Sequence, residues 1–327
     1  MTSQPPEGHD AAGKQEQGID QYRRRFLVGL AKAGAAGGAV VASAAAVTSA
    51  PAQGAWGGST LREMLGDFFQ EQYTRMTPAE IEAALARIER KAKRKFGVDI
   101  SCEDTPPLPG VVYGYALNIS RCKGYRDCVD ACVKENNLGR DSQVQYIRVL
   151  QMDNGTMNLE RSEHYYDPAT VPVEGKFYLP VQCMQCDNPP CVKACPVEAT
   201  WQEPDGIVAI DYDWCIGCRY CMDACPYGAR HFNWTEPQIP PDQLNRQTNY
   251  LGNRPRPKGV VEKCHFCTQR TRKGLQPACQ DACPTGARIF GNLLDPNSEI
   301  RWVLANKKVF RLKEELGTEP KFWYFTD

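Results

Sequence analysis

Cysteine is the residue that most limits what this chain can fold into. The sequence has 16 cysteines in 327 residues, and all but one of them follow residue 110 in four groups. This usage is far above average, but the chain is too long to be a small scaffold held together by disulfides. The spacing within the groups therefore has to indicate what the thiols do.

The third group has the most informative spacing. It reads Cys215-Ile-Gly-Cys218-Arg-Tyr-Cys221-Met-Asp-Ala-Cys225-Pro226, which is the C-x2-C-x2-C-x3-C-P run of bacterial ferredoxins. In that run three closely spaced thiolates bind one four-iron cluster, and the fourth binds the neighbouring cluster. The pattern therefore predicts iron–sulfur clusters that occur in pairs.

The other groups are variants of this run. The second group has two extra residues before its third cysteine and is the predicted partner of the third group. The fourth group has an 11-residue loop before its third cysteine and is expected to pair with the first, in which Tyr125 stands where the second cysteine belongs. The first group contains Cys122, Cys128 and Cys132; the second contains Cys183, Cys186, Cys191 and Cys195; and the fourth contains Cys264, Cys267, Cys279 and Cys283.

Structural zinc is the main alternative, because cysteines two residues apart also form tetrahedral zinc sites. A zinc-stabilised scaffold does not explain the run that ends in C-x3-C-P, and a disulfide framework explains it still less. Covalent haem requires C-x-x-C-H, which the sequence lacks. His265 directly follows Cys264 and is interpreted as a packing or hydrogen-bonding residue.

Residues 1–52 are predicted to be an export region. The first 22 residues are polar and predicted to be disordered. Arg23-Arg24-Arg25-Phe26-Leu27-Val28 then precedes a stretch rich in Ala, Gly and Val and the small-x-small run Ala50-Pro51-Ala52. This arrangement resembles a twin-arginine signal, which exports proteins already folded with their cofactors. Retention of the apolar stretch as an N-terminal membrane anchor is the alternative.

Residues 53–105 are predicted to be a helical extension and linker, with helical periodicity over 59–97. Thr77-Pro78-Ala79-Glu80 is expected to open the second helix as a capping box, and Gly97 to end it. The basic run at residues 90–95 is interpreted as a solvated face, with docking to a partner as the alternative. Cys102 lies in a Pro-rich, mobile connection and is interpreted as a free thiol, with a role as a substitute cluster ligand as the alternative.

Residues 106–327 are predicted to be a cluster-binding domain of the α+β class. A short strand is expected at residues 207–210 and an inserted loop at 236–259. The tail is expected to hold a helix from about Ser298 to Asn306, the segment 309–312 and the aromatic run 322–325. The 39 basic and 39 acidic residues cancel, so no global field favours a nucleic-acid partner or an anionic membrane.

From about Tyr113 to its end, the sequence resembles the four-cluster iron–sulfur (beta) subunits of membrane-associated oxidoreductases. These include subunits of polysulfide reductase, dimethyl sulfoxide reductase and formate dehydrogenase, and the iron–sulfur part of alternative complex III. The resemblance rests on Cys191-Val-Lys-Ala-Cys195-Pro, the third cysteine group, Pro226-Tyr-Gly-Ala-Arg230 and Cys283-Pro-Thr-Gly-Ala-Arg288. It implies two ferredoxin-like lobes with pseudo-two-fold symmetry and a C-terminal tail that wraps partner subunits.

The resemblance also implies the ligand sets. They are Cys183, Cys186, Cys191 and Cys225; Cys195, Cys215, Cys218 and Cys221; Cys132, Cys264, Cys267 and Cys279; and Cys122, Cys128 and Cys283. The last set lacks a fourth thiol, and the phenol of Tyr125 is a poor ligand for an iron held by sulfide. We therefore predict three 4Fe-4S clusters and one 3Fe-4S cluster, with a fourth 4Fe-4S cluster completed by Cys102 as the alternative.

The function implied by the resemblance is electron transfer without a catalytic site of its own. The chain would relay electrons between a polytopic quinone-reactive membrane subunit and a molybdopterin catalytic subunit or a multihaem cytochrome c, on the periplasmic side of the bacterial inner membrane. A free periplasmic ferredoxin shuttle is the second hypothesis. The basic residues beside ligands are predicted to raise cluster potentials, with structural salt bridges as the alternative; they are Arg219, Arg230, Lys263 and Arg288.

Overall fold

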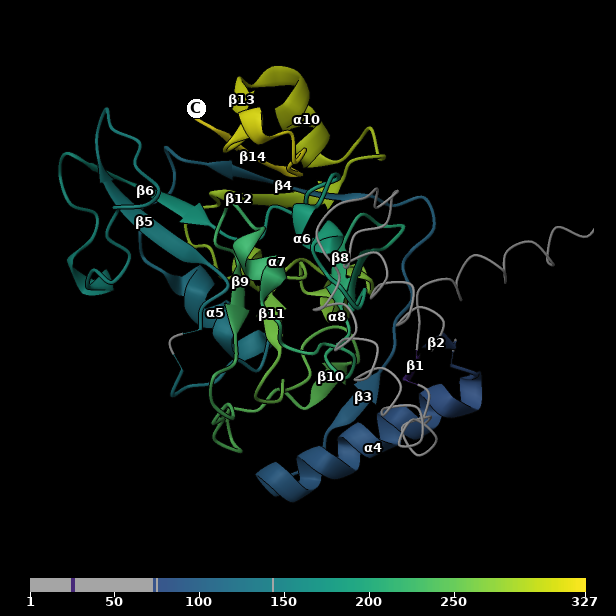
Figure 1. The fold of residues 1–327 in the computed structure, drawn as a ribbon. Coiled ribbons are helices and arrows are strands. Elements are labelled where there is room, and N and C mark those ends of the chain that lie inside the picture. Colours follow the sequence, from purple (N-terminus) through teal and green to yellow (C-terminus); the bar gives the residue numbers. More distant parts are fainter. Residues whose placement is uncertain (1–24, 27–72, 75, 143) are drawn as a thin grey trace, which may run out of the picture. The chain divides into compact units, whose positions relative to one another are not determined.

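The computed structural model describes residues 25–26, 73–74, 76–142 and 144–327 (Figure 1). The chain divides into a unit of residues 1–81 and a larger unit of residues 82–327. In the smaller unit, β1 (Arg25–Phe26) pairs antiparallel with β2 (Tyr73–Thr74). The rest of the predicted export signal and the predicted helical segment at 59–72 lie outside the described residues.

Helix α4 (Pro78–Phe96) begins at the predicted capping box. The Thr77 N–H donates to Glu80 Oε2 at 2.9 Å, and the Glu80 N–H donates to Thr77 Oγ1 at 3.4 Å. Gly97 follows the helix with a φ of +71°, a left-handed conformation that glycine adopts without strain. The predicted start and end of this helix are confirmed.

A four-stranded sheet with the order β12-β4-β14-β13 lies in the larger unit (Figure 1). Its strands are β4 (Tyr113–Asn118), β12 (Arg288–Asn292), β13 (Val309–Phe310) and β14 (Phe322–Phe325). Strand β4 is antiparallel to β12, parallel to β14 and buried along its whole length. The sheet therefore uses β4 and β14 as central strands.

The two faces of β4 contact different parts of the core. Successive side chains of a strand point to opposite faces, so Tyr115 and Leu117 belong to the main core. Ala116 instead packs in a smaller cluster with Ile300 of α10 (Glu299–Asn306). Helix α10 thus covers one face of the sheet. This helix confirms the expectation for residues 298–306, and the aromatic run 322–325 forms β14.

The remaining strands of the larger unit form small two-stranded sheets. They are β5 (Arg148–Asp153) with β6 (Lys176–Val181), β7 (Thr200–Gln202) with β8 (Val208–Ile210), and β9 (Arg230–Phe232) with β11 (Val261–Lys263), all antiparallel. Two 3-10 turns, η4 (Pro168–Thr170) and η5 (Glu314–Leu316), lie in connections. Strand β8 confirms the expected strand at residues 207–210, which begins one residue later in the structure.

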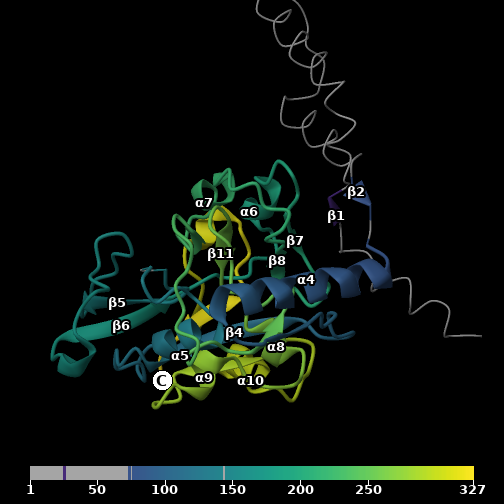
Figure 2. The ribbon, with the colours of Figure 1, turned by 90° about the horizontal axis from the view of Figure 1, so that it is seen from below.

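Five helices carry or adjoin the cysteine groups. They are α5 (Asp127–Glu135), α6 (Pro190–Lys193), α7 (Tyr220–Asp223), α8 (Thr268–Thr271) and α9 (Ala278–Asp281). Helix α5 packs against α9, and α6 packs against α7. In Figure 2 the α6–α7 pair lies at one end of the domain and the α5–α9 pair at the other. The predicted mixture of helices and strands, the α+β class, is confirmed.

The segment around Cys102 differs from the expectation. We predicted a mobile connection there, but β3 (Ser101–Glu103) pairs in parallel with β10 (Gln247–Asn249), and Cys102 is buried. The Cys102 N–H donates to Glu89 Oε1 at 2.8 Å, which ties this strand to α4. Strand β10 also means that the inserted loop at 236–259 is not wholly irregular.

Candidate functional site

All sixteen cysteines are free thiols, and each cysteine of the four predicted ligand sets, that is all but Cys102, has another thiol of its set as an electrostatic neighbour. We number these sets as sites. Site 1 contains Cys122, Cys128 and Cys283; site 2 contains Cys132, Cys264, Cys267 and Cys279; site 3 contains Cys183, Cys186, Cys191 and Cys225; and site 4 contains Cys195, Cys215, Cys218 and Cys221.

The thiols within a site disfavour one another's ionisation. Burial, followed by the charge of Cys183, Cys191 and Cys225, raises the pKa of Cys186 to about 12. Burial with the other thiols of site 1 likewise raises the pKa of Cys122 to about 11. Such clustered, buried thiolates are stable only beside compensating positive charge, which iron ions supply to their ligands.

The four sites form a row. Cys128 of site 1 has Cys279 of site 2 as an electrostatic neighbour, and Cys264 of site 2 has Cys183 of site 3. Sites 3 and 4 adjoin at Arg230, whose neighbours include thiols of both sites. The order along the row is therefore site 1, site 2, site 3, site 4.

Two loops present cysteines with the same backbone conformation. Gly124 and Gly217 have φ values of +80° and +70°, and the Arg126 and Arg219 that precede α5 and α7 both have a φ of +67°. Tyr125 lies between the first glycine and arginine, as Cys218 lies between the second pair. Tyr125 therefore occupies in site 1 the backbone position that Cys218 occupies in site 4.

Tyr125 lies close to the thiols of site 1. It lines a small cavity together with Cys122, Cys128, Cys283 and Arg288. Its side chain is 40% exposed, so the open edge of the site faces solvent. The structure thus places a phenol, and no fourth thiol of the described residues, at this edge.

The three Cys-Pro steps form the same hydrogen-bonded turn. In each, the N–H groups two and four residues after the cysteine donate to its sulfur: Val197 and Ala199 to Cys195, Tyr227 and Ala229 to Cys225, and Thr285 and Ala287 to Cys283. Burial raises the pKa of Cys195 and Cys225, and these donors oppose that shift. At Cys283 the donors, with the Thr285 hydroxyl, outweigh burial and lower the pKa.

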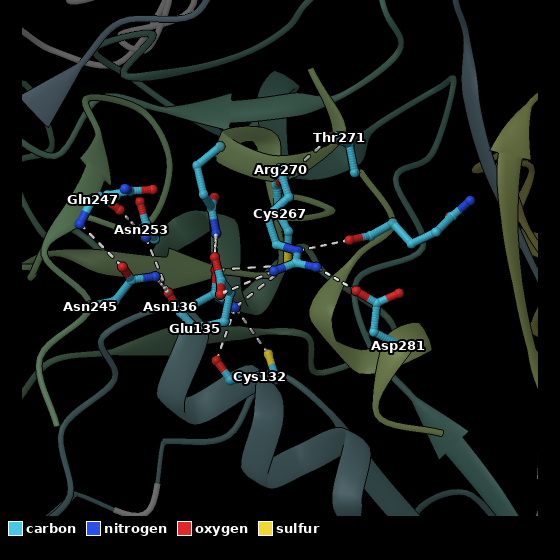
Figure 3. Close-up of polar contacts among 12 residues, drawn as sticks. Cys132, Glu135, Asn136, Asn245, Gln247, Asn253, Cys267, Arg270, Thr271 and Asp281 are labelled. Carbon is cyan, nitrogen blue, oxygen red and sulfur yellow. Dashed lines mark hydrogen bonds and ion pairs between the residues drawn. The ribbon is translucent and has the colours of Figure 1, made fainter. Parts of the chain in front are cut away.

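Site 2 is surrounded by neutral donors, which the sequence motifs did not predict. Asn136 Nδ2 lies 3.4 Å from Cys132 Sγ and 3.8 Å from Cys267 Sγ. Figure 3 shows this amide at the end of α5 pointing toward both thiols. Tyr115 Oη lies 3.4 Å from Cys279 Sγ. The spacing of Cys132 and Asn136, four residues apart and so on one helix face, was a signal that could have revealed the amide.

Polar side chains around Asn136 are linked to one another by hydrogen bonds and ion pairs (Figure 3). Gln269 Nε2 donates to Glu135 Oε1 at 2.9 Å and lies 3.4 Å from Asn136 Oδ1. Arg270 pairs with Glu135 at 3.7 Å and with Asp281 of α9. Because α5 and α9 both carry thiols of site 2, this network fixes the positions of the ligand-bearing helices relative to each other.

The surroundings of Arg230 indicate whether the residues of sites 3 and 4 fit iron–sulfur clusters. Its Nη2 donates to Cys191 Sγ at 3.0 Å and to Thr200 Oγ1 at 3.1 Å. Its Nε and Nη1 are buried and have no hydrogen-bond partner, which is costly for a guanidinium. A cluster bound by thiolates would provide negative charge and sulfide acceptors at this place. The residues therefore fit such a cluster.

The four predicted basic neighbours have different surroundings. Arg230 and Arg288 contact thiols directly, and Lys263 donates to the carbonyl oxygens of Val208 and Cys264. Arg219 is exposed and stacks over Trp234, with 4.7 Å between its guanidinium carbon and the ring centre. None of the four forms a salt bridge with a described carboxylate, so the described residues give no support to the alternative of structural salt bridges.

Cys102 and His265 lie apart from the four sets. Burial raises the pKa of Cys102, and its charged neighbours are Arg254, Glu89 and Asp213 rather than thiols. His265 Nδ1 accepts from the Thr268 N–H at 3.2 Å, which confirms a hydrogen-bonding role at the start of α8.

Among the described residues, no group of His, Cys, Asp and Glu side chains is arranged to hold a single metal ion. No helix in the described ranges is long and apolar enough to cross a bilayer.

Comparisons with known proteins agree with this geometry. A family model described as a 4Fe-4S dicluster domain matches residues 175–256 and 250–293. The chain is 42% identical over 214 residues to a putative dimethyl sulfoxide reductase iron–sulfur subunit of Halobacterium salinarum, covering 65% of this chain and 78% of the relative.

Two further relatives are similar over most of their length. The menaquinone reductase iron–sulfur cluster-binding subunit of Nitratidesulfovibrio vulgaris is 36% identical over 242 residues, which are 66% of this chain and 89% of that protein. One of the polysulfide reductase chains of Wolinella succinogenes is 35% identical over 216 residues, which are 64% of this protein and 92% of that relative. This chain therefore belongs to the family of iron–sulfur subunits that carry electrons in membrane-associated oxidoreductases.

Proposed function

We propose that this chain relays single electrons along a row of four iron–sulfur clusters bound at sites 1 to 4. The observation that carries the proposal is the row of four thiol sets, each buried and each adjoining the next. When bound, each cluster accepts and releases one electron. The thiols bind the clusters, the turn amides and site 2 donors hydrogen-bond to sulfur, and the surrounding core excludes water.

The cofactors we propose are three 4Fe-4S clusters at sites 2, 3 and 4 and one 3Fe-4S cluster at site 1. Support comes from Tyr125, which lines site 1 at the backbone position of a cysteine in site 4. A phenol is a harder ligand than a thiolate and a poor partner for an iron that is held by sulfide. The iron at that corner would therefore lack a protein ligand.

We propose two ferredoxin-like lobes with pseudo-two-fold symmetry within residues 106–327. The pairing of α5 with α9 and of α6 with α7, together with the repeated Cys-Pro turn, supports this arrangement. Residues 53–105 would form the helical extension, and 1–52 the twin-arginine export region. Strand β14 belongs to this chain's own sheet, so the largely exposed segment 307–317 is the part of the tail that would wrap a partner subunit.

The proposed partners are a quinone-reactive membrane subunit and either a molybdopterin enzyme or a multihaem cytochrome c. The proposed place is the periplasmic side of the inner membrane, reached by the twin-arginine route, with the N-terminal segment either cleaved or retained as an anchor. The name of the menaquinone reductase relative supports a quinone-linked complex, and that of the polysulfide reductase relative supports a reductase complex. The substrate of that complex belongs to its other subunits.

Metal content tests the central proposal. Protein purified without oxygen is expected to contain about 15 iron atoms per chain, because three four-iron clusters and one three-iron cluster are proposed. Elemental analysis of iron and zinc, with visible absorption that bleaches on reduction, measures this. Stoichiometric zinc with negligible iron would contradict the proposal and favour the zinc-stabilised scaffold.

Cell fractionation tests the place and the partners. We expect mild detergent to extract the native protein together with a multi-span membrane protein. A variant with Arg23→Lys and Arg24→Lys should remain in the cytoplasm as a folded, cluster-loaded precursor, because the export route recognises the arginine pair. Recovery of the native protein only as a soluble monomer would favour the periplasmic shuttle, and export of the double variant would show that the signal is wrongly assigned.

A further inference from the structure

Seven lysine and arginine side chains are buried in the described part of the chain, and they fall into two classes. Four of them form salt bridges with carboxylates: Arg254 with Asp211 and Asp213, Arg256 with Glu262, Arg272 with Glu203 and Asp205, and Lys321 with Asp187. The other three, Arg230, Lys263 and Arg288, have no described carboxylate partner. A buried charge is expensive unless it is compensated, so these three need another source of negative charge.

Arg288 lies between sites 1 and 2. Its Nη2 is 3.4 Å from Cys128 Sγ of site 1, and its Nη1 is 3.8 Å from Cys279 Sγ of site 2. Gln182 Oε1 accepts a hydrogen bond of 2.9 Å from the same Nη1 and fixes the guanidinium in this position. The charge of Arg288 therefore acts on two sites at once.

Lys263 lies between sites 2 and 3. Its Nζ donates to the carbonyl oxygen of Cys264, a site 2 residue, at 2.9 Å, and also to the carbonyl oxygen of Val208. Its electrostatic neighbours are Cys264 of site 2 and Cys183 and Cys191 of site 3. The ammonium group is thus fully enclosed at the middle of the row.

Arg230 lies between sites 3 and 4. It donates to Cys191 Sγ of site 3 at 3.0 Å, and its charge also acts on Cys221 of site 4. In the β9–β11 pair Arg230 stands directly opposite Lys263. Like charges in that position repel, which again requires an anionic group between them.

We propose that Arg288, Lys263 and Arg230 are junction charges, each of which raises the reduction potentials of the two clusters that it separates. This inference rests on the proposed function, because it concerns residues that face the proposed clusters. Each reduction adds one negative charge, and a nearby positive charge in a water-excluded site stabilises the reduced form. One cation between two sites favours reduction of either cluster.

The arrangement predicts an overlapping pattern of effects. Arg288→Met should lower the potentials of clusters 1 and 2, Lys263→Met those of clusters 2 and 3, and Arg230→Met those of clusters 3 and 4. Each affected cluster should change its reduction equilibrium at least tenfold, which corresponds to about 59 mV for one electron. Redox titration followed by electron paramagnetic resonance on the complete purified protein measures all the potentials.

Matched variants separate charge from packing. Arg230→Lys keeps the charge and should keep potentials close to those of the wild type. Arg230→Gln keeps a hydrogen-bond donor for Cys191 but loses the charge. It should therefore lower the reduction potentials of clusters 3 and 4, even if Arg230→Met does not load its clusters. Arg219→Met provides the control, since Arg219 also adjoins a thiol of site 4 but is exposed to solvent, which screens its charge.

The outcomes distinguish this inference from the proposed function. Wild-type protein without iron would contradict the proposed function itself. Cluster-loaded neutral variants with unchanged potentials, or with a shift of only one cluster, would overturn the junction charges while leaving the four-cluster relay intact. An Arg230→Lys variant with potentials as low as those of Arg230→Gln would also overturn the inference, because the charge would then have no effect.

Discussion

Replacement of Tyr125 by cysteine is expected to abolish the electron paramagnetic resonance signal of an oxidised three-iron cluster and to raise the iron content by about one atom per chain. Tyr125 lines site 1 with three thiols, and the two glycine–arginine turns give it the backbone position of Cys218. A thiol at this position can reach the fourth corner of a cube. The wild type should show the three-iron signal and the variant should lack it.

Tyr125→Phe is the matched control for this result. It removes the hydroxyl and adds no ligand, so the three-iron signal should persist if the phenol does not bind iron. The competing ligand is Cys102, which the structure buries in β3 with Arg254, Glu89 and Asp213 as its charged neighbours. A wild type without the signal, combined with its appearance in Cys102→Ala, would identify Cys102 as the fourth ligand and exclude our assignment.

The second large effect concerns stability. Arg272→Met is expected to lower the free energy of unfolding by roughly 3–5 kcal/mol, the usual cost of removing one partner from a buried ion pair. Arg272 Nε donates to Asp205 Oδ2 at 2.8 Å, and Nη2 donates to Glu203; all three side chains are buried. Without the guanidinium, the two buried carboxylates lose the positive charge of Arg272.

Thermal unfolding measures this effect as a Tm lower by roughly 6–20 °C for a domain of this size. Combining Arg272→Met with Glu203→Gln and Asp205→Asn should restore part of the loss, because the amides carry no charge. Lys93→Met is the control, since the Lys93–Asp99 pair is solvent-exposed and such pairs contribute about 0–1 kcal/mol. Equal losses for Arg272→Met and Lys93→Met would contradict the argument.

The sequence was sufficient where the chemistry depends on residues close together along the chain. The capping box at Thr77 and Glu80, the stop at Gly97 and the strand β8 are local patterns, and the structure has all of them. The cysteine spacing indicated clusters in pairs for the same reason, because a ferredoxin run places three thiols on one short loop and helix.

The features that the sequence did not reveal depend on distant residues. Cys102 belongs to a strand because β3 pairs with β10, which lies almost 150 residues further along the chain. The partners of Arg272 are likewise about 70 residues away. Composition and periodicity depend on residues that are close together along the chain. They therefore do not show which buried lysine or arginine contacts a carboxylate and which contacts a thiol.

The order of the four sites along the sequence determines which loops the chain has to close when it folds. Sites 3 and 4 take all their thiols from residues 183–225, whereas sites 1 and 2 combine residues 122–132 with residues 264–283, on either side of that segment. Loop-closure entropy grows with the logarithm of loop length. The outer loop, residues 122–283, is roughly four times as long as the inner loop, residues 183–225. Closing the outer loop therefore costs about 1 kcal/mol more in chain entropy. During synthesis the inner thiols also emerge together, before the last outer thiols exist. We therefore expect the inner sites to organise first and the outer sites to close around them.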